Sequence, residues 1–510
     1  MRVLVFHGYL LRGTGSNIYN ASLARALADL GHEVHLLCQD RDAAELDFVD
    51  AIGDWDSGEL SVRVIREPVR TTIYLPPIGR VLPVYVADEY EGFEAKTFGA
   101  LDEAELERYL AANVGAVRDV ATWARPEVAL ANHVVMGPAV LARGLDGKVP
   151  YAVKIHGSAL EYTVKPEPDR FLPYAREGLA GAGGVLVGSR HTAESLWQAL
   201  DDPALPERTR LGPPGVDVAA FRAAPAAEAR ARLAALADRI EGVSASWGGD
   251  ADAAAALRSL DPARDRIVSY VGKLIASKGV ELALAAWPLV LARVPDARLV
   301  VVGFGTYDEG LRRLLAALAS GDLAAARDIA ARGRELEGGE RAELPQLAAF
   351  LDSLEGAARD AYLAAAPALA GRVVFTGRLE HADLPDLLCA CEAQVVPSTF
   401  PEAFGMVAAE AAACGALPLS TAHSGLAEVS ALLAPALDPP LRGLLRFEAG
   451  PDAVRELARK LIAWLELDPA ERERARTALA GAARGLFGWD EVARRVIAAA
   501  QGRLGELPRP

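Results

Sequence analysis

Short apolar runs, each followed by a turn and a helical pattern, recur along the first half of the chain. The run RVLVF at 2–6 precedes a glycine-containing loop, and the next segment has apolar residues at helical spacing up to Leu30. A glycine stop and a second run at 33–38 complete one strand–helix–strand unit. Further runs of this kind lie at 128–132, 151–155 and 184–188. The pattern predicts a parallel α/β layer with helices on both faces.

The same alternation returns after residue 266 and predicts a second α/β domain of similar size. Its apolar runs are 266–272, 297–303, 372–377, 392–398 and 416–420. Between the halves, the turn cluster PPGVD leads into an alanine- and arginine-rich stretch and then into the glycine-rich SWGGDAD. We therefore expect domains at 1–212 and 266–485, with a crossing region at 213–265.

Two segments interrupt this alternation. Residues 71–100 are rich in proline and aromatic residues that either stack on a sugar, approach a lipid or pack structurally. These aromatic residues include Tyr74, Tyr85, Tyr90 and Phe93. Residues 306–370 have charges at helical spacing and predict a helical insertion, either functional or a solvated hairpin. At the end of the chain, 489–504 predicts an amphipathic helix capped by Asp490.

Composition limits the partners and the cellular compartment that we expect for this protein. The 510 residues exceed one core, and the net charge of −15 argues against nucleic acid as the main partner. The four cysteines have neither metal-ligand spacing nor a disulfide framework, which favours a reducing cytoplasm. The apolar start is too short for a signal peptide, and no apolar run approaches the roughly twenty residues that span a bilayer. Peripheral contact with a membrane through a local basic patch is left open.

Two glutamates flank a helix start in PEAFGMVAAEAAACG at 401–415. A strand-like run ends at 395–398, and the pattern predicts a helix over 404–414. Ligands of open α/β sheets bind where such loops enter helices, and the unpaired first N–H groups of a helix suit a phosphate. Glu402 can accept hydrogen bonds from hydroxyls beside that phosphate, and Glu410 can reach a diol such as ribose. A phosphate between two polyols indicates a nucleotide sugar; the alternative is a capping acid and a solvated glutamate.

Two lysines follow another strand end in VGKLIASKG at 271–279. Gly272 forms a turn after the strand, and Lys273 and Lys278 lie on the loop and at the next helix start. Ammonium groups there can neutralise the charge that builds on a departing diphosphate. The alternative is a pair of solvated surface lysines.

Glycines and histidines follow strand ends in the first half. Gly13 and Gly15 suit a close approach to phosphate or sugar, or a plain tight turn; the third glycine of a dinucleotide fingerprint is absent, so a nicotinamide site is not expected. His156 follows one strand and can touch a substrate hydroxyl, unless its role is structural. Asn132 and His133 hold the equivalent place after the preceding strand, and we assign them to the acceptor side of the same cleft.

Together these segments resemble the retaining, nucleotide-sugar-dependent glycosyltransferases of family four, which have the GT-B fold. The most specific segment contains E-x-F-G with a second glutamate eight positions after the first. The resemblance covers most of the chain apart from 71–100, parts of 220–265 and 306–370. It implies two Rossmann-like domains facing an interdomain cleft, with the donor held mainly by the second domain. It also implies that the C-terminal helix at 486–510 returns to the first domain.

The resemblance implies roles for individual residues. Glu402 would contact sugar hydroxyls, Glu410 the ribose and Lys278 the diphosphate. Lys273 stands where the family usually has arginine, so it keeps the charge without the bidentate fork. His156 would lie near the donor sugar. The other expected donor-binding residues are Gly13, Thr14, Gly15, Gly272, Arg378, Leu379, Phe404, Gly405, Met406 and Val407.

In such enzymes the acceptor hydroxyl attacks the anomeric carbon from the face that the diphosphate leaves, and the leaving oxygen takes the acceptor proton. Configuration is retained, and no dedicated base is required. We find no convincing general-base pair and no D-x-D motif in a suitable loop, so we expect no metal and no cofactor. The expected donor is a UDP or GDP sugar, and the expected acceptor is a carbohydrate, polyol or lipid-linked hydroxyl. The alternatives are a nucleotide-sugar epimerase and a non-catalytic nucleotide-sugar-binding protein.

Overall fold

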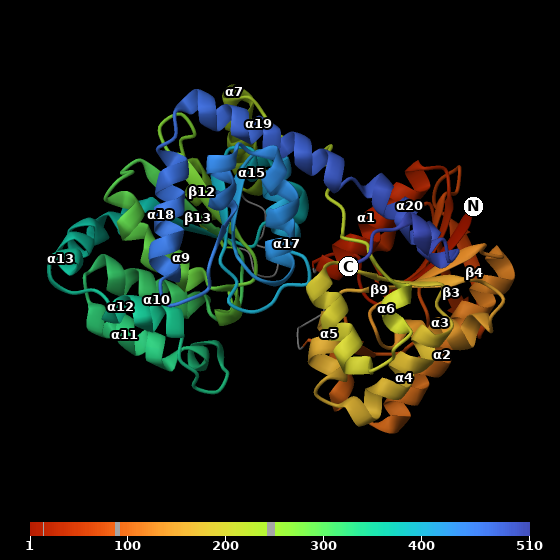
Figure 1. Ribbon diagram of the computed structural model, residues 1–510. Coiled ribbons are helices and arrows are strands. Elements are labelled where there is room, and N and C mark those ends of the chain that lie inside the picture. The colour runs from red at the N-terminus through yellow and green to blue at the C-terminus, as the bar shows by residue number, and fades with distance from the viewer. Residues whose placement is uncertain (14, 87–91, 242–249) are drawn as a thin grey trace. The chain divides into compact units, whose positions relative to one another are not determined.

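The chain forms two compact units in the computed structural model, which describes residues 1–13, 15–86, 92–241 and 250–510. Unit 1 comprises Met1–Gly215 and Gly488–Pro510, and unit 2 comprises Val216–Phe487. Figure 1 follows the chain from the red start of unit 1, through the green and blue helices of unit 2, to the blue C-terminal helix of unit 1. Two α/β units with a helical insertion in the second confirm the predicted fold class.

Unit 1 is built on a nine-stranded sheet with the order β11-β10-β9-β8-β1-β2-β5-β3-β4. The strands are β1 Arg2–Phe6, β2 Glu33–Leu37, β3 Ala51–Asp56, β4 Glu59–Val64, β5 Thr71–Tyr74, β8 Val128–Asn132, β9 Tyr151–Ile155, β10 Gly184–Val187 and β11 Thr209–Leu211. β4 pairs antiparallel with β3, and the other neighbours are parallel. Val3 and Val5 of β1 lie in one core cluster, whereas Leu4 and Phe6 lie in another, so both faces of the sheet are covered.

The helices of unit 1 follow its strands. They are α1 Gly15–Asp29, α2 Glu103–Ala124, α3 Gly137–Leu145, α4 Pro168–Ala180, α5 Arg190–Leu200, α6 Leu205–Arg208 and α20 Trp489–Ala500. α20 packs along α1 and β9 (Figure 1) and buries Val492 and Val496 in the unit 1 core. Its N-cap is Gly488, so the predicted cap at Asp490 is wrong. Asp490 lies instead in the first turn, where a negative charge favours the helix dipole.

Unit 2 is built on a six-stranded parallel sheet with the order β14-β13-β12-β15-β16-β17. The strands are β12 Arg266–Val271, β13 Ala297–Val302, β14 Val373–Gly377, β15 Ala393–Val396, β16 Leu417–Thr421 and β17 Arg446–Phe447. The chain runs outward from β12 to β14 and then returns to the other side of β12. Such a reversal of strand order opens a crevice outside the carboxyl ends of the two central strands, β12 and β15, where ligands of doubly wound folds bind.

The helices of unit 2 include the predicted insertion. They are α7 Ala226–Ile240, α8 Ala253–Arg258, α9 Val280–Leu291, α10 Asp308–Ala319, α11 Leu323–Arg332, α12 Pro345–Asp352, α13 Gly356–Ala365, α14 Leu369–Arg372, α15 Leu384–Leu388, α16 Met406–Ala413, α17 Ser424–Leu433, α18 Ala453–Leu465 and α19 Pro469–Leu486. The insertion between β13 and β14 supplies α10 to α14, drawn in green and teal in Figure 1. Its Leu311, Leu314, Leu347 and Phe350 lie in the unit 2 core, which excludes a solvated hairpin.

The expected crossing region at 213–265 is too long. Phe221, Leu233 and Leu257 lie in the unit 2 core, because α7 and α8 bury their apolar sides there. The change between the units falls at Gly215 and Val216 instead.

The excursion at 71–100 is partly strand rather than irregular. Thr71–Tyr74 is β5 of the main sheet, and β6 Val81–Val84 pairs with β7 Glu94–Thr97. Tyr74 and Tyr85 are buried, as the structural-packing alternative predicts, and Tyr90 lies outside the described residues.

The structure also shows the state of the cysteines and the character of the apolar helices. All four cysteines are free and buried, which agrees with the absence of a disulfide framework in their spacing. Within the described part of the chain, no helix combines the length and the apolar character that crossing a membrane requires.

Candidate active site

Lys278 and Glu402 meet at the strand reversal of unit 2. Lys278 follows β12 and Glu402 follows β15, the two strands that flank the crevice. The Lys278 ammonium donates to Oε1 of Glu402, although 124 positions separate the two residues. The side chains are 30% and 23% exposed, so a ligand can reach both. The structure therefore brings together one member of the predicted lysine pair and one of the predicted glutamate pair.

A set of polar residues holds Glu402 in place. The Ser398 hydroxyl donates to Oε1 of Glu402 at 2.6 Å, and the Glu402 N–H donates to Oγ of Ser424 at 2.9 Å. His423 donates from Nε2 to the Ser398 carbonyl at 2.9 Å, so its Nδ1 can accept the Ser424 hydroxyl at 3.0 Å. Both side-chain contacts use Oε1, and no described residue hydrogen-bonds Oε2. That oxygen can accept from a substrate hydroxyl.

Backbone contacts join the two loops that carry this pair. The Ser277 carbonyl accepts the N–H of Thr399 at 3.0 Å and that of Phe400 at 3.3 Å. Gly279 has a left-handed φ of 68°, and a Cβ there would lie 2.0 Å from the Pro397 carbonyl oxygen. Glycine is therefore required for the loops to approach so closely.

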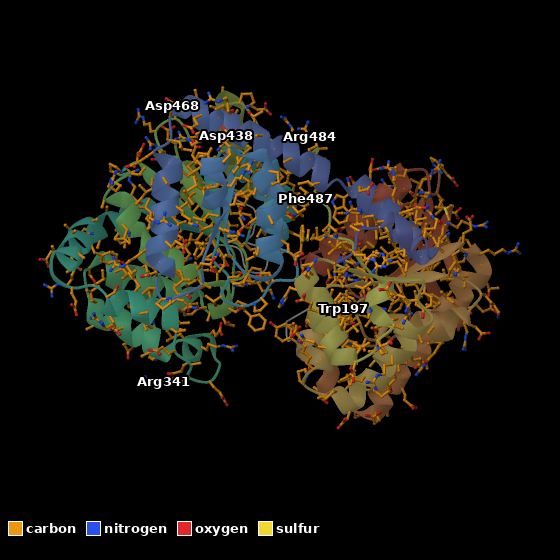
Figure 2. The ribbon with its side chains drawn as sticks, in the orientation of Figure 1. Trp197, Arg341, Asp438, Asp468, Arg484 and Phe487 are labelled. Carbon is orange, nitrogen blue, oxygen red and sulfur yellow. The ribbon has the colours of Figure 1, made fainter. Side chains whose placement is uncertain are left out.

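Helix α16 begins beside these loops, two residues later than predicted. Gly405 has φ 97°, which excludes it from the helix, so the first turn opens at Met406 rather than at Phe404. Phe404 is buried, and its ring lies 5.7 Å from that of Phe487, which Figure 2 labels at the end of α19. Met406 and Val407 are half-buried and contribute first-turn N–H groups with no partner inside the helix.

Glu410 is more enclosed than the sequence indicated. It is 2% exposed, and its Oε1 accepts Nε2 of His381 at 2.8 Å. Burial disfavours the charged imidazole, but the hydrogen bond and the charges of Glu410 and Asp217 outweigh burial and raise the pKa of His381. The solvated-glutamate alternative is therefore wrong. His381 is 33% exposed and is the accessible end of the pair.

The remaining predicted donor-side residues surround the same strand ends. Lys273 is half-buried, and its carbonyl accepts the Tyr270 hydroxyl at 2.8 Å; Gly272 is half-buried beside it. Arg378 pairs with Glu380 at 3.0 Å, and Leu379 is 9% exposed. Within the described residues, no group of three or more His, Cys, Asp and Glu side chains is placed to hold a metal ion.

In unit 1 the strand order reverses between β1 and β8, and a chain of polar side chains crosses that point. His156 lies 2.8 Å from Oδ1 of Asn132, and Asn132 donates to Asn20 Oδ1 at 2.7 Å. Asn20 donates to Nδ1 of His7 at 3.0 Å, and Nε2 of His7 lies 3.0 Å from Asn17 Oδ1. We call these five residues the amide–imidazole chain.

Donor and acceptor assignments fix the imidazole tautomers of this chain. Because His7 accepts at Nδ1, its proton is on Nε2, which donates to Asn17. Because Asn132 spends its amide protons on Asn20 and on the Phe6 carbonyl, its oxygen accepts Nε2–H of His156. Burial lowers the pKa of His7 to about 4 and that of His156 well below its usual value. His156 is thus a neutral, oriented imidazole, half-buried rather than exposed.

His133 lies against this chain without joining it. It is 1% exposed, adopts a left-handed φ of 68°, and its ring centroid is 4.9 Å from that of His156. Neither ring nitrogen has a hydrogen-bond partner among the described residues. Strained backbone of this kind costs about 1–3 kcal/mol and concentrates at functional sites. Of the predicted glycine loop, Gly13 has φ 94° and Gly15 opens α1, whereas Thr14 lies outside the described residues.

The sequence did not single out the residues that support these sites. They are His7, Asn17, Asn20, His381, Ser398, His423 and Ser424. A signal existed for some of them, because AHSG at 422–425 follows β16 and His7 follows β1, at the strand ends where ligands bind.

Two family descriptions match the chain. "Glycosyl transferase 4-like domain" matches residues 14–215, and "Glycosyl transferases group 1" matches residues 355–480. The first lies in unit 1 and includes the amide–imidazole chain from Asn17 onward. The second includes Glu402 and Glu410 with their partners Ser398, Ser424 and His381, whereas Lys278 lies outside it.

Full-length relatives agree with these matches. The chain is 26% identical to D-inositol 3-phosphate glycosyltransferase of Frankia alni over 497 residues, which are 95% of this chain and 93% of the relative. Sucrose-phosphate synthase from Thermosynechococcus elongatus has a similar fold, with TM-score 0.58 and 20% identity over 99% of both chains. Anabaena HepE in complex with UDP-glucose also has this fold, with TM-score 0.56 and 16% identity over 99% of this chain and 100% of HepE.

Proposed function

Because the chain belongs to the nucleotide-sugar glycosyltransferases of family four, we propose that it moves a hexosyl group from a UDP or GDP sugar to a hydroxyl of a carbohydrate or polyol. We propose that the anomeric configuration is retained and that neither a metal nor a cofactor takes part. The HepE structure, which contains UDP-glucose, supports a uridine donor.

The ion pair of Lys278 and Glu402 carries this proposal. A cation and a carboxylate on two joined loops, beside the first turn of α16, suit a ligand with an anionic and a hydroxyl-bearing part. In the absence of donor, Glu402 neutralises Lys278. When a donor binds, its diphosphate takes the ammonium, and Glu402 is released to accept from sugar hydroxyls.

The chemistry required of unit 2 is charge stabilisation. As the bond to the anomeric carbon breaks, negative charge grows on the leaving phosphate oxygen. Lys278 and the first N–H groups of α16 are fixed dipoles and charges that stabilise it without reorganising. They supply the positive charge that a divalent cation provides elsewhere. The phosphate oxygen then takes the acceptor proton.

We assign the acceptor to unit 1. His156 is neutral and presents Nδ1 as an acceptor, because Asn132 fixes its proton on Nε2. His133 is itself buried, and its ring centroid lies 4.9 Å from that of His156, so it packs against that imidazole. Neutral imidazoles recognise uncharged hydroxyl groups and do not repel the anionic donor. A polyol acceptor fits these groups.

The donor can be identified from the stability of the protein. We expect either UDP or GDP at millimolar concentration to raise the melting temperature, because ligand that binds the native state stabilises it by mass action. AMP serves as the comparison, and calorimetric titration of the active nucleotide gives the affinity. A melting temperature that responds to no nucleoside diphosphate would contradict a nucleotide-sugar site.

The ion pair is tested by substitution. Lys278→Ala and Glu402→Ala should each lower turnover by at least about a hundredfold, as removal of a transition-state donor does. Lys148, which is 79% exposed in unit 1, supplies the control variant Lys148→Ala with unchanged turnover. Near-normal turnover in a folded Lys278→Ala protein would overturn the proposal.

A nucleotide-sugar epimerase is distinguished by omitting the acceptor. Incubation with the donor alone should leave its sugar unaltered in NMR spectra, because transfer requires a second hydroxyl. Conversion of the sugar under these conditions would favour the epimerase.

A further inference from the structure

The loop that carries Lys278 is held by the helical insertion as well as by its own neighbours. The N–H of Ala276 donates to Oε2 of Glu337 at 2.8 Å, across 61 positions of sequence. Glu337 ends the 3₁₀ turn Arg334–Glu337 between α11 and α12, and its side chain is 9% exposed. Its other oxygen, Oε1, accepts Nε of Arg334 at 2.9 Å. Each carboxylate oxygen of Glu337 therefore has a partner.

This turn of the insertion is itself fixed. Gly333 adopts φ 48° and forms a bridge with Ala342, and the Arg334 N–H donates to the Ala342 carbonyl at 3.1 Å. Leu336 packs against the unit 2 core beside Gly310 at the start of α10. Arg341, on the same loop, lies at the periphery of unit 2 (Figure 2) and is exposed. The end that bears Glu337 is thus the anchored one.

Ala276 and Lys278 belong to the same 3₁₀ turn, Ala276–Lys278, so a displacement of Ala276 also displaces Lys278. Ser277 between them accepts from Thr399 and Phe400 of the loop that carries Glu402. The turn is therefore clamped from two sides, by the Glu402 loop and by Glu337. An N–H at the start of such a turn has no partner within the turn, and a carboxylate acceptor makes a stronger bond than a neutral one.

We propose that Glu337 is a positioning residue for transfer: it holds the Ala276–Lys278 turn so that the Lys278 ammonium meets the leaving diphosphate. This inference rests on the proposed function. It gives the insertion a part in catalysis, since the insertion supplies the carboxylate. Arg334 neutralises Glu337, which reduces its repulsion of an anionic donor.

Substitutions of Glu337 distinguish the effect of its side-chain length from the effect of its charge. Glu337→Ala removes the acceptor, and Glu337→Asp keeps the charge but is one methylene shorter; both should lower kcat about tenfold or more. Glu337→Gln retains an oxygen at the same reach and should stay within about threefold of the parent. The matched control is Glu335→Ala in the same turn, since Glu335 pairs with Arg332 and should not affect kcat.

Combination with Lys278→Ala distinguishes positioning from a merely structural role. If Glu337 acts through Lys278, Glu337→Ala should cost nothing further in the Lys278→Ala background, because the group it positions is gone. An additive loss in the double variant, or parent-like kcat in Glu337→Asp, would overturn the inference. Should Glu337→Ala fail to fold, the Asp and Gln pair gives the same comparison. Full activity of Lys278→Ala alone would instead count against the proposed function.

Discussion

Glu402 shows how one carboxylate stays charged in a largely enclosed place. Burial by itself would raise its pKa, but the charge of Lys278 and the hydrogen bonds from Lys278 and Ser398 outweigh burial, and the net pKa is lowered. The side chain is therefore an anion at neutral pH. As an anion, Glu402 can accept hydrogen bonds from hydroxyl groups, in keeping with the proposed contact to the donor sugar.

The amide–imidazole chain yields a prediction for Asn20, which joins Asn132 to His7 from a fully buried place in α1. Asn20→Ala leaves two buried polar groups without this partner and should cost about 1–3 kcal/mol of stability. It should also lower kcat about tenfold, because Asn132 no longer fixes His156. Chemical denaturation and steady-state kinetics measure the two effects.

Asn113 supplies the matched control for this prediction. Asn113 lies in α2 and is equally buried. Its side chain donates to the Tyr109 carbonyl and is not part of the amide–imidazole chain. Asn113→Ala should lose stability without losing kcat. Equal kinetic losses in both variants would assign Asn20 a structural role only.

At the scale of elements, the candidate site depends on the close approach of the two loops that follow β12 and β15. β12 and β15 are neighbours, so the loops that follow them emerge side by side, and the Ser277 carbonyl ties one to the other. The ion pair of Lys278 and Glu402 depends on this contact. Glycine at 279 is what allows it.

Gly279→Ala should therefore lower turnover at least about tenfold and reduce the melting temperature. The new Cβ would collide with the Pro397 carbonyl, and alanine also resists the φ of 68°. Gly321→Ala is the control, because Gly321 has φ 76° but its nearest neighbour, a Leu363 methyl, lies at an ordinary 3.4 Å. If both variants retain the parent's turnover, the close approach of the loops is not needed for catalysis.

At the scale of the molecule, the two units repeat one arrangement. In each, the first strand lies beside a strand from later in the chain. Most predicted site residues follow these two strands, whereas His156 follows β9 and Arg378 and Leu379 follow β14. The units differ in their buried titratable groups. Unit 1 encloses histidines held neutral by burial, whereas unit 2 encloses Glu281, which burial keeps protonated, in addition to the charged Glu402.

This difference predicts opposite pH dependence of the two units. Burial lowers the pKa of His7 and His35 to about 4, so below pH 6.5 the unfolded chain binds protons that folded unit 1 does not. Each excluded proton removes about 1.4 kcal/mol of stability per pH unit. In unit 2, burial raises the pKa of Glu281 to about 8, so the folded state keeps a proton that the unfolded chain has lost. Acidification therefore stabilises unit 2 through this group.

Calorimetric scans between pH 7 and pH 5.5 check this sign. The transition of unit 1 should move to lower temperature and that of unit 2 should not follow it, with hydrogen exchange assigning each transition. His35→Gln should weaken the acid sensitivity of unit 1, because one excluded proton is removed. A uniform shift of both transitions would contradict the assignment.

Much of the fold could be predicted because its signals are local. Buried parallel strands are continuous apolar runs, and β1, β8 and β9 have the predicted bounds. Prediction missed the hairpin of β3 and β4, because β4 alternates polar and apolar residues at the sheet edge and so lacks the continuous apolar run of a buried parallel strand. The two-residue error at α16 has a local cause as well, since the φ of Gly405 follows from its loop rather than from helix propensity.

The sequence by itself determined the α/β class, the two units and the strand ends at which polar residues gather, because these depend on short-range patterns of burial and turn chemistry. Only the tertiary structure decided which of those residues meet. Lys278 and Glu402, Asn20 and Asn132, and Ala276 and Glu337 are 124, 112 and 61 positions apart, respectively. These residues meet because the strand order and the anchored insertion bring their loops together. Neither the strand order nor the anchoring can be predicted from the local periodicity of the sequence.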